Sequence, residues 1–109
     1  MKNKDFQIIY KKGKSYANKY LIMYVLNNKE EENRLGISVS KKVGNSVVRH
    51  RITRLIRENY RLNCKTFRLG YDIVIIARAS AKDKTYQELE SALIHLAKLH
   101  NIVEDLSEK

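Results

Sequence analysis

Apolar residues recur at regular intervals along this chain, and the interval changes from one segment to the next. Near the start, Phe6, Ile9 and Tyr10 follow the three- and four-residue spacing of one helix face. Asn3 is a suitable N-cap for such a helix. We therefore predict a short helix from Asn3 to about Lys12.

Two strands are predicted next. The apolar run Tyr20–Leu26 is too short for a buried helix and rich in strand-forming residues, so we predict a strand covered on both faces. The polar segment Asn27–Asn33 is then expected to form a hairpin loop. After it, Leu35, Ile37 and Val39 alternate with small residues, which predicts a strand with one apolar face. Its small face suits either the floor of a groove or a solvent-exposed surface.

A long amphipathic helix is predicted after this strand. Gly44 permits a tight turn, Asn45 or Ser46 can cap the helix, and the helical pattern runs to about Leu62. One side of the helix is expected to face the core and comprises Val48, Ile52, Leu55, Ile56 and Asn59. Glu58 is the only acidic residue of the helix. The basic surface comprises Arg49, His50, Arg54, Arg57 and Arg61, with Arg51 on the flank.

The last part of the chain predicts one more strand and one more helix. The apolar run Tyr71–Ala77 is expected to be a buried strand that pairs in parallel with the preceding strand around the helical crossover. Thr85 and Glu88 have the spacing of a capping box, and a stripe of leucines after them predicts a final helix. The pattern therefore predicts a single mixed α+β domain, 1–109, with three strands.

Charge points to a partner. The 22 lysines and arginines outnumber the 12 acidic residues, so the formal net charge is +10, which is large for 109 residues. Such a surface favours a polyanion, because neutralised phosphates release their counterions. On the long helix, Arg54, Arg57 and Arg61 repel one another unless an anion is present. This face is therefore expected to bind phosphate groups, which arginine can contact through two hydrogen bonds at once.

The aromatic residues of the first helix have two interpretations. Phe6 and Tyr10 are consistent with ordinary core packing. Lys11, Lys12 and Lys14 lie beside them, so the rings also fit single-stranded RNA binding, in which bases stack on rings while cations hold phosphates.

The sequence offers no recognisable catalytic constellation. Cys64 is the only cysteine, so neither a disulfide nor a cysteine zinc cluster is expected. The histidines lack the spacing of a metal pair, and no serine lies in a nucleophile elbow. We therefore expect a protein that binds without cutting, with no catalytic residue and no metal ligand. Without a membrane-length apolar run or a signal-peptide pattern, it is expected to be cytoplasmic and to have no membrane partner.

The segment that spans the second predicted strand, the turn after it and much of the long helix resembles a known signature. It reads Arg34-x-Gly36-x-Ser38-Val39-Ser40-Lys41-Lys42-Val43-Gly44-Asn45-Ser46-Val47-Val48-Arg49-His50-Arg51-x-x-Arg54-x-x-Arg57. In this register, the strand, the turn and the arginine-rich helix resemble the bacterial ribonuclease P protein subunit. The likeness extends to Asp5-Phe6 and to Ile75-Ile76-Ala77-Arg78, so it covers nearly the whole chain.

The resemblance implies a fold and a function. The fold is a ribosomal-protein-like αβββαβα sandwich with its basic helix in a left-handed βαβ crossover, against the usual right-handed rule. The function is tRNA maturation by an endoribonuclease whose RNA subunit removes the 5′ leader of precursor tRNA. The protein is expected to bind both the catalytic RNA and the leader, and Mg²⁺ is expected to be bound mainly by the RNA.

The resemblance also assigns residues by position. Contact with the catalytic RNA is implied for Lys41, Lys42, Gly44, Asn45, Arg49, His50 and Arg51. The cleft for the leader is implied for Phe6, Tyr10, Tyr24, Thr53, Arg54 and Arg57. Lys12 and Arg61 extend the basic surface. Two positions depart from the family pattern, since His50 stands where asparagine is usual and Thr53 where lysine is common.

Other functions compete with this one. A structural RNA-binding protein of ribosomal type would use the same basic helix on ribosomal RNA. A self-sufficient metal-dependent nuclease would need clustered acids, which the sequence lacks. A basic helix can also enter the major groove of DNA.

Overall fold

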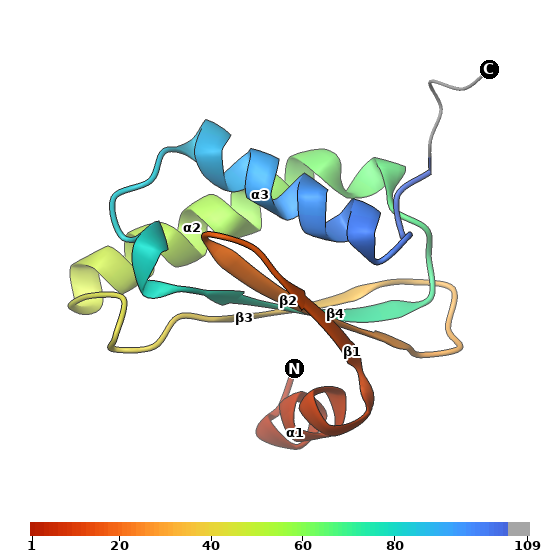
Figure 1. Ribbon diagram of the computed structural model, residues 1–109. Helices are drawn as coiled ribbons and strands as arrows, with labels where there is room; N and C mark the ends of the chain where they lie inside the picture. The colour runs from red at the N-terminus through yellow and green to blue at the C-terminus, as the bar shows by residue number, and fades with distance from the viewer. Residues whose placement is uncertain (105–109) are drawn as a thin grey trace.

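The computed structural model describes residues 1–104 and shows a sheet with helices on both faces (Figure 1). The helices are α1 (Asn3–Lys12), α2 (Ser46–Asn63) and α3 (Tyr86–Leu99). The strands are β1 (Lys14–Ala17), β2 (Leu21–Asn27), β3 (Arg34–Ser38) and β4 (Tyr71–Ala77). Short 3-10 turns, Cys64–Thr66 and Ala79–Ala81, flank β4. The order αβββαβα that the resemblance implied is confirmed.

The four strands lie in the order β1-β2-β4-β3. β3 and β4 are parallel, as predicted, whereas β2 pairs antiparallel with both β1 and β4. The prediction of a hairpin between β2 and β3 is wrong, because β4 lies between these strands. β4 is one of the two inner strands, and its middle is apolar and fully covered, since Ile73, Val74 and Ile75 are all 0% exposed.

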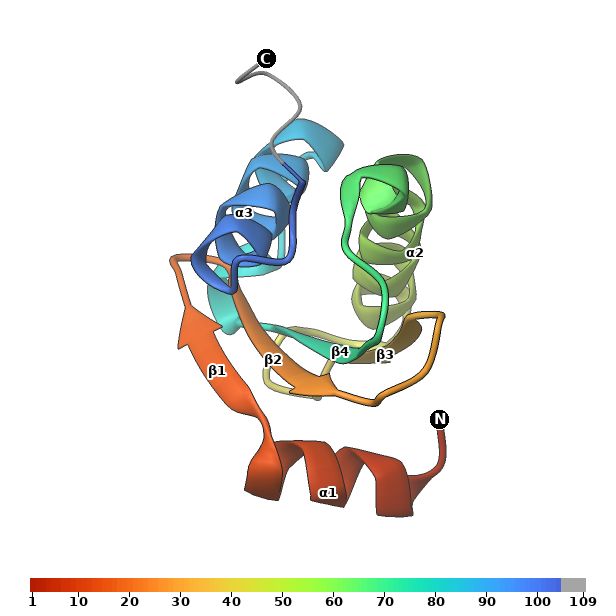
Figure 2. The ribbon, with the colours of Figure 1, turned by 90° about the vertical axis from the view of Figure 1, so that its right-hand side faces the viewer.

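Two helices cover one face of the sheet, and α1 covers part of the other (Figure 2). The main core fills the space between the sheet and the pair α2 and α3. Met23 of β2 and Ile75 of β4 enter it from the sheet, and Ile56 of α2 and Leu96 of α3 meet them from above. Ile52, Ile56 and the amide-bearing Asn59 are the buried residues of α2, so the predicted core face of this helix is confirmed.

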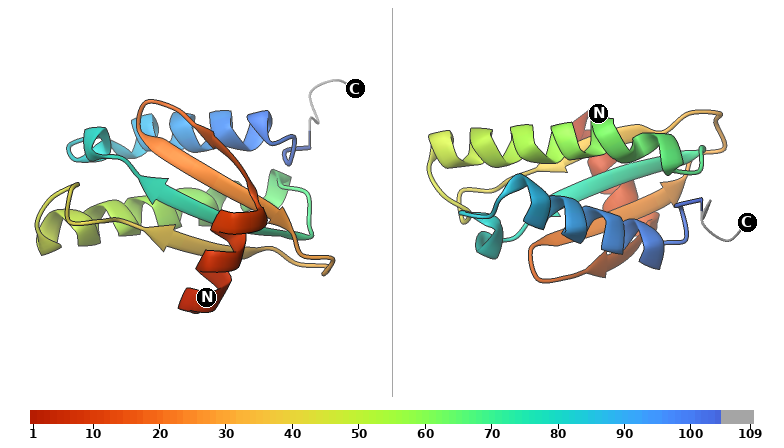
Figure 3. Two further views of the ribbon diagram at one scale, coloured as in Figure 1. Left: turned by 60° about the horizontal axis from the view of Figure 1, so that its bottom comes forward. Right: turned by 90° about the horizontal axis from the view of Figure 1, so that it is seen from above.

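The connection from β3 through α2 to β4 is left-handed (Figure 3). With the strands pointing upward and the helices toward the viewer, β4 lies to the left of β3. Most parallel crossovers have the opposite hand. As a result, α2 lies over the edge of the sheet formed by β3, and the side of α2 that faces away from α3 is not covered by another helix or strand of residues 1–104 (Figure 2).

β1 is the strand that the sequence pattern missed. It spans four residues and pairs with β2, with Lys14 opposite Val25 and Ala17 opposite Ile22. Tyr16 is its only half-buried residue, and the other three are exposed. The strand therefore lacks the alternation of apolar and polar residues by which a strand is predicted. The tight connection in this sheet is therefore the Asn18–Tyr20 turn between β1 and β2.

Three smaller predictions also change. Lys2 is the N-cap of α1 in place of Asn3, because its backbone N–H donates to Oδ2 of Asp5 at 3.0 Å. β2 is buried on one face only, since Tyr24 and its same-face neighbours are half-buried under the short α1. β3 ends at Ser38, earlier than the predicted alternation through Val39.

Candidate nucleic-acid interface

α1 lies directly against β3 at Gly36. A Cβ atom at this position would lie 2.7 Å from Cζ of Phe6, so only glycine allows so close an approach. In the next turn of α1, the side chain of Ile9 is buried and only 1% exposed. The small face of β3 is thus not an open groove at Gly36, because the ring of Phe6 fills that space.

Three aromatic rings form a row beside this contact. The ring centroids of Phe6 and Tyr10 are 6.2 Å apart, and those of Tyr10 and Tyr24 are 5.0 Å apart in an edge-to-face arrangement. Tyr10 stays 39% exposed, so its ring is packed on one side and accessible on the other. Burial raises the pKa of the Tyr10 hydroxyl above its ordinary value.

A shallow cleft of about 310 Å³ opens along this row of rings. Its walls are Asn3, Phe6, Gln7, Tyr10, Ile37 and Ser38. Of the residues assigned to the leader cleft by resemblance, the structure places Phe6 and Tyr10 in its walls, and Tyr24 contacts Tyr10 without lining the cleft. Sequence reasoning missed Asn3, Gln7 and Ser38 as cleft residues. Asn3 and Gln7 are four residues apart, each three residues before an aromatic ring, and this helical spacing could have revealed them.

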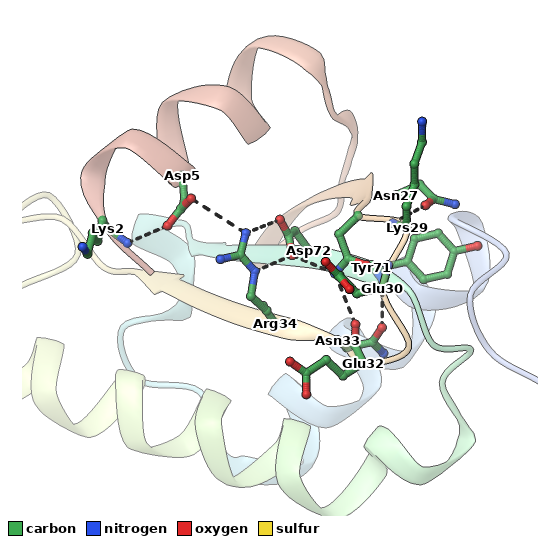
Figure 4. A network of polar contacts seen from close by, with 11 residues as sticks. Lys2, Asp5, Asn27, Lys29, Glu30, Glu32, Asn33, Arg34, Tyr71 and Asp72 are labelled. Carbon is green, nitrogen blue, oxygen red and sulfur yellow. Dashed lines mark hydrogen bonds and ion pairs between the residues drawn. The ribbon is translucent and has the colours of Figure 1, made fainter.

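A network of ion pairs attaches α1 to the sheet (Figure 4). Nε of Arg34 lies 2.8 Å from Oδ1 of Asp72, and its Nη2 lies 2.6 Å from Oδ2. Asp5 of α1 lies 3.8 Å from the same guanidinium, and the Asn28 amide donates to Asp72 at 3.0 Å. Pairing with Arg34 lowers the pKa of the Asp72 carboxyl. Sequence reasoning missed this network, because Asp72 lies within an apolar run.

The turn between β3 and α2 is held by its own backbone. The N–H of Val43 donates to the carbonyl of Ser40 at 3.0 Å, and the Val43 side chain is 2% exposed. A Cβ on Gly44 would lie 2.8 Å from Cγ1 of Val48, which explains the glycine. Oδ1 of Asn45 accepts the N–H of Val48 at 3.0 Å, so Asn45 is the N-cap of α2. The assigned residues Gly44 and Asn45 thus have structural reasons for their identity.

The basic residues of α2 point in different directions. Arg49, Thr53 and Arg57 follow at four-residue spacing and form one row along the helix. The Thr53 hydroxyl donates to the backbone carbonyl of Arg49 at 2.8 Å. Arg57 is exposed at the end of this row.

Arg51 and Arg54 lie on a different flank of α2. Arg51 donates to the carbonyl of Lys82 at 3.3 Å and to that of Lys84 at 2.9 Å, which ties α2 to the segment before α3. Arg54 lines a hollow of about 260 Å³ together with Arg51, Leu55 and Glu58. This hollow shares no residue with the aromatic cleft, so the structure does not bring Arg54 together with Phe6 and Tyr10.

Few of the remaining cations have acidic partners. Arg61 donates through Nε to Glu58 at 3.2 Å, and this pairing lowers the pKa of Glu58. Among residues 1–104, no carboxylate lies within 4.0 Å of the charged groups of the other assigned cations, which are Lys12, Lys41, Lys42, Arg49, Arg51, Arg54 and Arg57. His50 is exposed beside them. In the part of the chain that the structure describes, the lysines and arginines at the start of α2 thus have no acidic partner.

The family model described as Ribonuclease P matches residues 1–100 of this sequence. The chain belongs to the ribonuclease P protein family. The ribonuclease P protein component of Lachnoclostridium phytofermentans is 65% identical over 101 residues, which cover 93% of this chain and 87% of the relative. The solved structure of the Staphylococcus aureus RNase P protein aligns with a TM-score of 0.87 and 47% identity, covering 95% of each chain. The RNase P protein from Thermotoga maritima aligns with a TM-score of 0.82 and 32% identity, covering 87% of this chain and 90% of that one.

Family membership places the chain in tRNA processing, as a ribonuclease P protein component. The solved ribonuclease P proteins share its mixed α+β fold. Within residues 1–104, no three histidine, cysteine or acidic side chains gather in a group that could hold a metal ion. No helix in this part of the chain has the length and apolar character of a membrane span.

Proposed function

We propose that this chain is the non-catalytic protein subunit of ribonuclease P, a hydrolase whose catalytic centre is RNA. It binds the catalytic RNA and the 5′ leader of precursor tRNA. The RNA then removes the leader by endonucleolytic hydrolysis with Mg²⁺ that is bound mainly by RNA. We expect the chain to act in the cytoplasm.

The cleft under α1 is the observation that carries the proposal. Single-stranded RNA is bound by aromatic rings that offer a face or an edge to bases, with polar side chains nearby. Phe6 and Tyr10 supply the rings of the cleft, Tyr24 supports Tyr10 from behind in an edge-to-face contact, and Asn3 and Ser38 supply polar groups. A ring that served only the core would be buried, whereas Tyr10 remains 39% exposed.

The leader also needs cations for its phosphates. Arg57 and Arg54 are assigned this role by resemblance, and each lacks an acidic partner within the part of the chain that the structure describes. They are three residues apart on α2 and are therefore neighbours on its exposed side, with Arg57 nearer to Thr53 and Arg54 nearer to Arg51. Thr53, which directly precedes Arg54 in the sequence, contributes no charge.

The catalytic RNA is assigned to the start of α2 and the turn before it. Lys41, Lys42 and His50 are exposed there, and Asn45 fixes where the helix begins. Arg51 donates to two backbone carbonyls but has five N–H groups, so it can still reach a phosphate. His50 stands where the family usually has asparagine, and its ring can still donate a hydrogen bond to RNA or stack on a base.

Cleavage of a precursor tRNA at low Mg²⁺ concentration tests the proposal. The reaction is run with catalytic RNA alone, with protein alone and with both. Cleavage is expected only when both are present. Cleavage by the protein alone would reveal an active site in the chain. If the protein changes neither the rate nor the Mg²⁺ demand of the RNA, a structural RNA-binding role of ribosomal type becomes the better conclusion.

A further inference from the structure

The Asn18–Tyr20 turn is held from two sides. The Asn18 amide donates to the carbonyl of Ala92 in α3 at 2.9 Å. On the other side, Arg78 donates to the carbonyl of Asn18 at 2.9 Å, and the hydroxyl of Ser80 bonds to the carbonyl of Lys19. A hairpin tip at the surface does not need such ties to close. The turn is thus preorganised, and its exposed side chains are held in place at little further entropic cost.

This turn gathers two ammonium groups on one aromatic ring. Nζ of Lys19 lies 5.7 Å from the ring centroid of Tyr20, and Nζ of Lys84 lies 5.3 Å from the same centroid. Two like charges held near one ring repel each other, and a bound anion would offset that repulsion. Because the ring already holds two ammonium groups, phosphate binding suits it better than base stacking.

The acidic residues nearby do not neutralise the charge of Lys19 and Lys84. Asp83 lies 3.8 Å from Lys84, but its side chain is 84% exposed and the pair is weak in water. Glu88 lines the pocket beside the turn, and its carboxylate is occupied by the backbone N–H of Thr85 at 3.1 Å. The basic residues Lys19, Arg78, Lys82 and Lys84 outnumber these two acids.

The same end of the molecule carries the start of α2. In Figures 1 and 3, the Asn18–Tyr20 turn, the segment from β4 to α3 and the start of α2 lie at the same end of the molecule, whereas the loop with Glu30–Glu32 lies at the opposite end. Arg51 joins the two basic regions, because it donates to the carbonyls of Lys82 and Lys84. Basic residues are therefore present in each segment along this end of the molecule, from α2 through Lys82 and Lys84 to Lys19.

We propose that Lys19 and Lys84, organised by Tyr20, form a second phosphate-binding surface for the backbone of the catalytic RNA. This inference rests on the proposed function. The surface is assigned to the catalytic RNA, because Arg51 connects it to the residues assigned to that RNA and because it shares no wall with the aromatic cleft. Lysine offers a point charge without the paired geometry of arginine, so the contact is independent of RNA sequence.

Salt-dependent binding of catalytic RNA to a double variant tests this surface. Lys19→Gln/Lys84→Gln should weaken binding and reduce the slope of log affinity against log salt by about 2, one for each lost phosphate contact. The matched control is Lys65→Gln/Lys98→Gln, which removes the same charge from the 3-10 turn after α2 and from the last turn of α3. Tyr20→Leu keeps both lysines and should lose part of the affinity, whereas Tyr20→Phe should retain it. Thermal unfolding of each variant confirms that the fold is intact.

The outcomes separate this inference from the proposed function. If the unmodified protein does not bind catalytic RNA, the proposed function fails. If it binds and both double variants lose the same affinity and slope, only general charge matters and the second surface is refuted. A loss confined to precursor tRNA, measured without catalytic RNA, would also overturn the assignment.

Discussion

Arg34 on β3 and Asp72 on β4 stand opposite each other in neighbouring parallel strands and form a bidentate ion pair. The side chain of Asp72 is 7% exposed and that of Arg34 is 45% exposed. Folding therefore removes mainly the carboxylate from water, and that carboxylate depends on Arg34 for its partner. Asp5 of α1 lies 3.8 Å from the same guanidinium, so the pair also helps to hold the helix that forms the aromatic cleft.

Replacing Arg34 should therefore destabilise the protein. Arg34→Met leaves Asp72 buried with the Asn28 amide as its remaining side-chain partner, and we expect a loss of about 2 kcal/mol at pH 7. This value lies between those of surface and fully buried pairs, because Arg34 is half exposed. Urea unfolding measures it. Arg61→Met is the control. It breaks the exposed pair with Glu58 and should lower the free energy of unfolding by less than Arg34→Met does.

The pH dependence of stability offers a second check on this pair. The folded-state pKa of Asp72 is lowered, so its stabilisation is present above the unfolded pKa of about 4 and is lost as pH falls through the folded pKa. The unfolding free energies of the unmodified protein and Arg34→Met should therefore converge in acid. A difference that stays constant from pH 7 to pH 3 would show that the arginine acts through packing alone.

Gly36 should not tolerate even alanine. The added Cβ would meet Cζ and Cε1 of Phe6 at 2.7 and 2.8 Å, and overpacking of this kind costs about 1–3 kcal/mol. Phe6→Leu in the Gly36→Ala background should recover part of the loss, although Phe6→Leu alone is destabilising. A double-mutant cycle by denaturant unfolding measures this coupling. Additive effects would mean that the two residues do not touch.

Tyr10 should matter for the leader more than for the fold. Stacking of a base on an aromatic ring contributes about 1–3 kcal/mol, so Tyr10→Leu should weaken binding of leader-bearing precursor tRNA by roughly 5- to 150-fold. Binding of mature tRNA should change little. Tyr86→Leu on α3, outside the cleft, is the control. An unfolded Tyr10 variant would support the core-packing interpretation instead.

The sequence pattern predicts elements well where one physical signal dominates. The bounds of β4 and the capping box of α3 are confirmed, because a long apolar run and a Thr-x-x-Glu spacing are local signals. β1 was missed because a four-residue edge strand buries almost nothing and is defined by its pairing with β2. The place of β4 between β2 and β3 is likewise a property of the whole sheet.

The residues of the candidate site also differ in how far the sequence predicts them. Phe6 and Tyr10 are visible from the sequence as one helix face, and their neighbour Tyr24 joined them only by resemblance. The roles of Arg34 and Arg51 were not predictable, since their partners are carboxylates and carbonyls far along the chain. A row of arginines in a sequence therefore does not reveal which of them are available to RNA.

Arg54 and Arg57 provide a test of how far the leader extends. By resemblance, alanine at either position should weaken leader-bearing precursor more than mature tRNA. Arg57 lies in the row with Arg49 and Thr53, whereas Arg54 lines the hollow beside Arg51. Binding of both RNAs to each variant is measured at matched salt. Equal losses for the two RNAs would identify that arginine as a general anchor.

Thr53→Lys should strengthen leader binding. Thr53 lies between Arg49 and Arg57 in one row of α2, and its hydroxyl is used only on the backbone of its own helix, so lysine removes no contact with another element. The added cation should raise the affinity for leader-bearing precursor and steepen the salt slope by about 1, the effect of one phosphate contact. Lysine also favours helix more than threonine, so stability should not fall. Lys29→Thr/Thr53→Lys keeps the net charge and is the control for general attraction. If the gain disappears in this control, or appears equally with mature tRNA, the row of α2 does not face the leader.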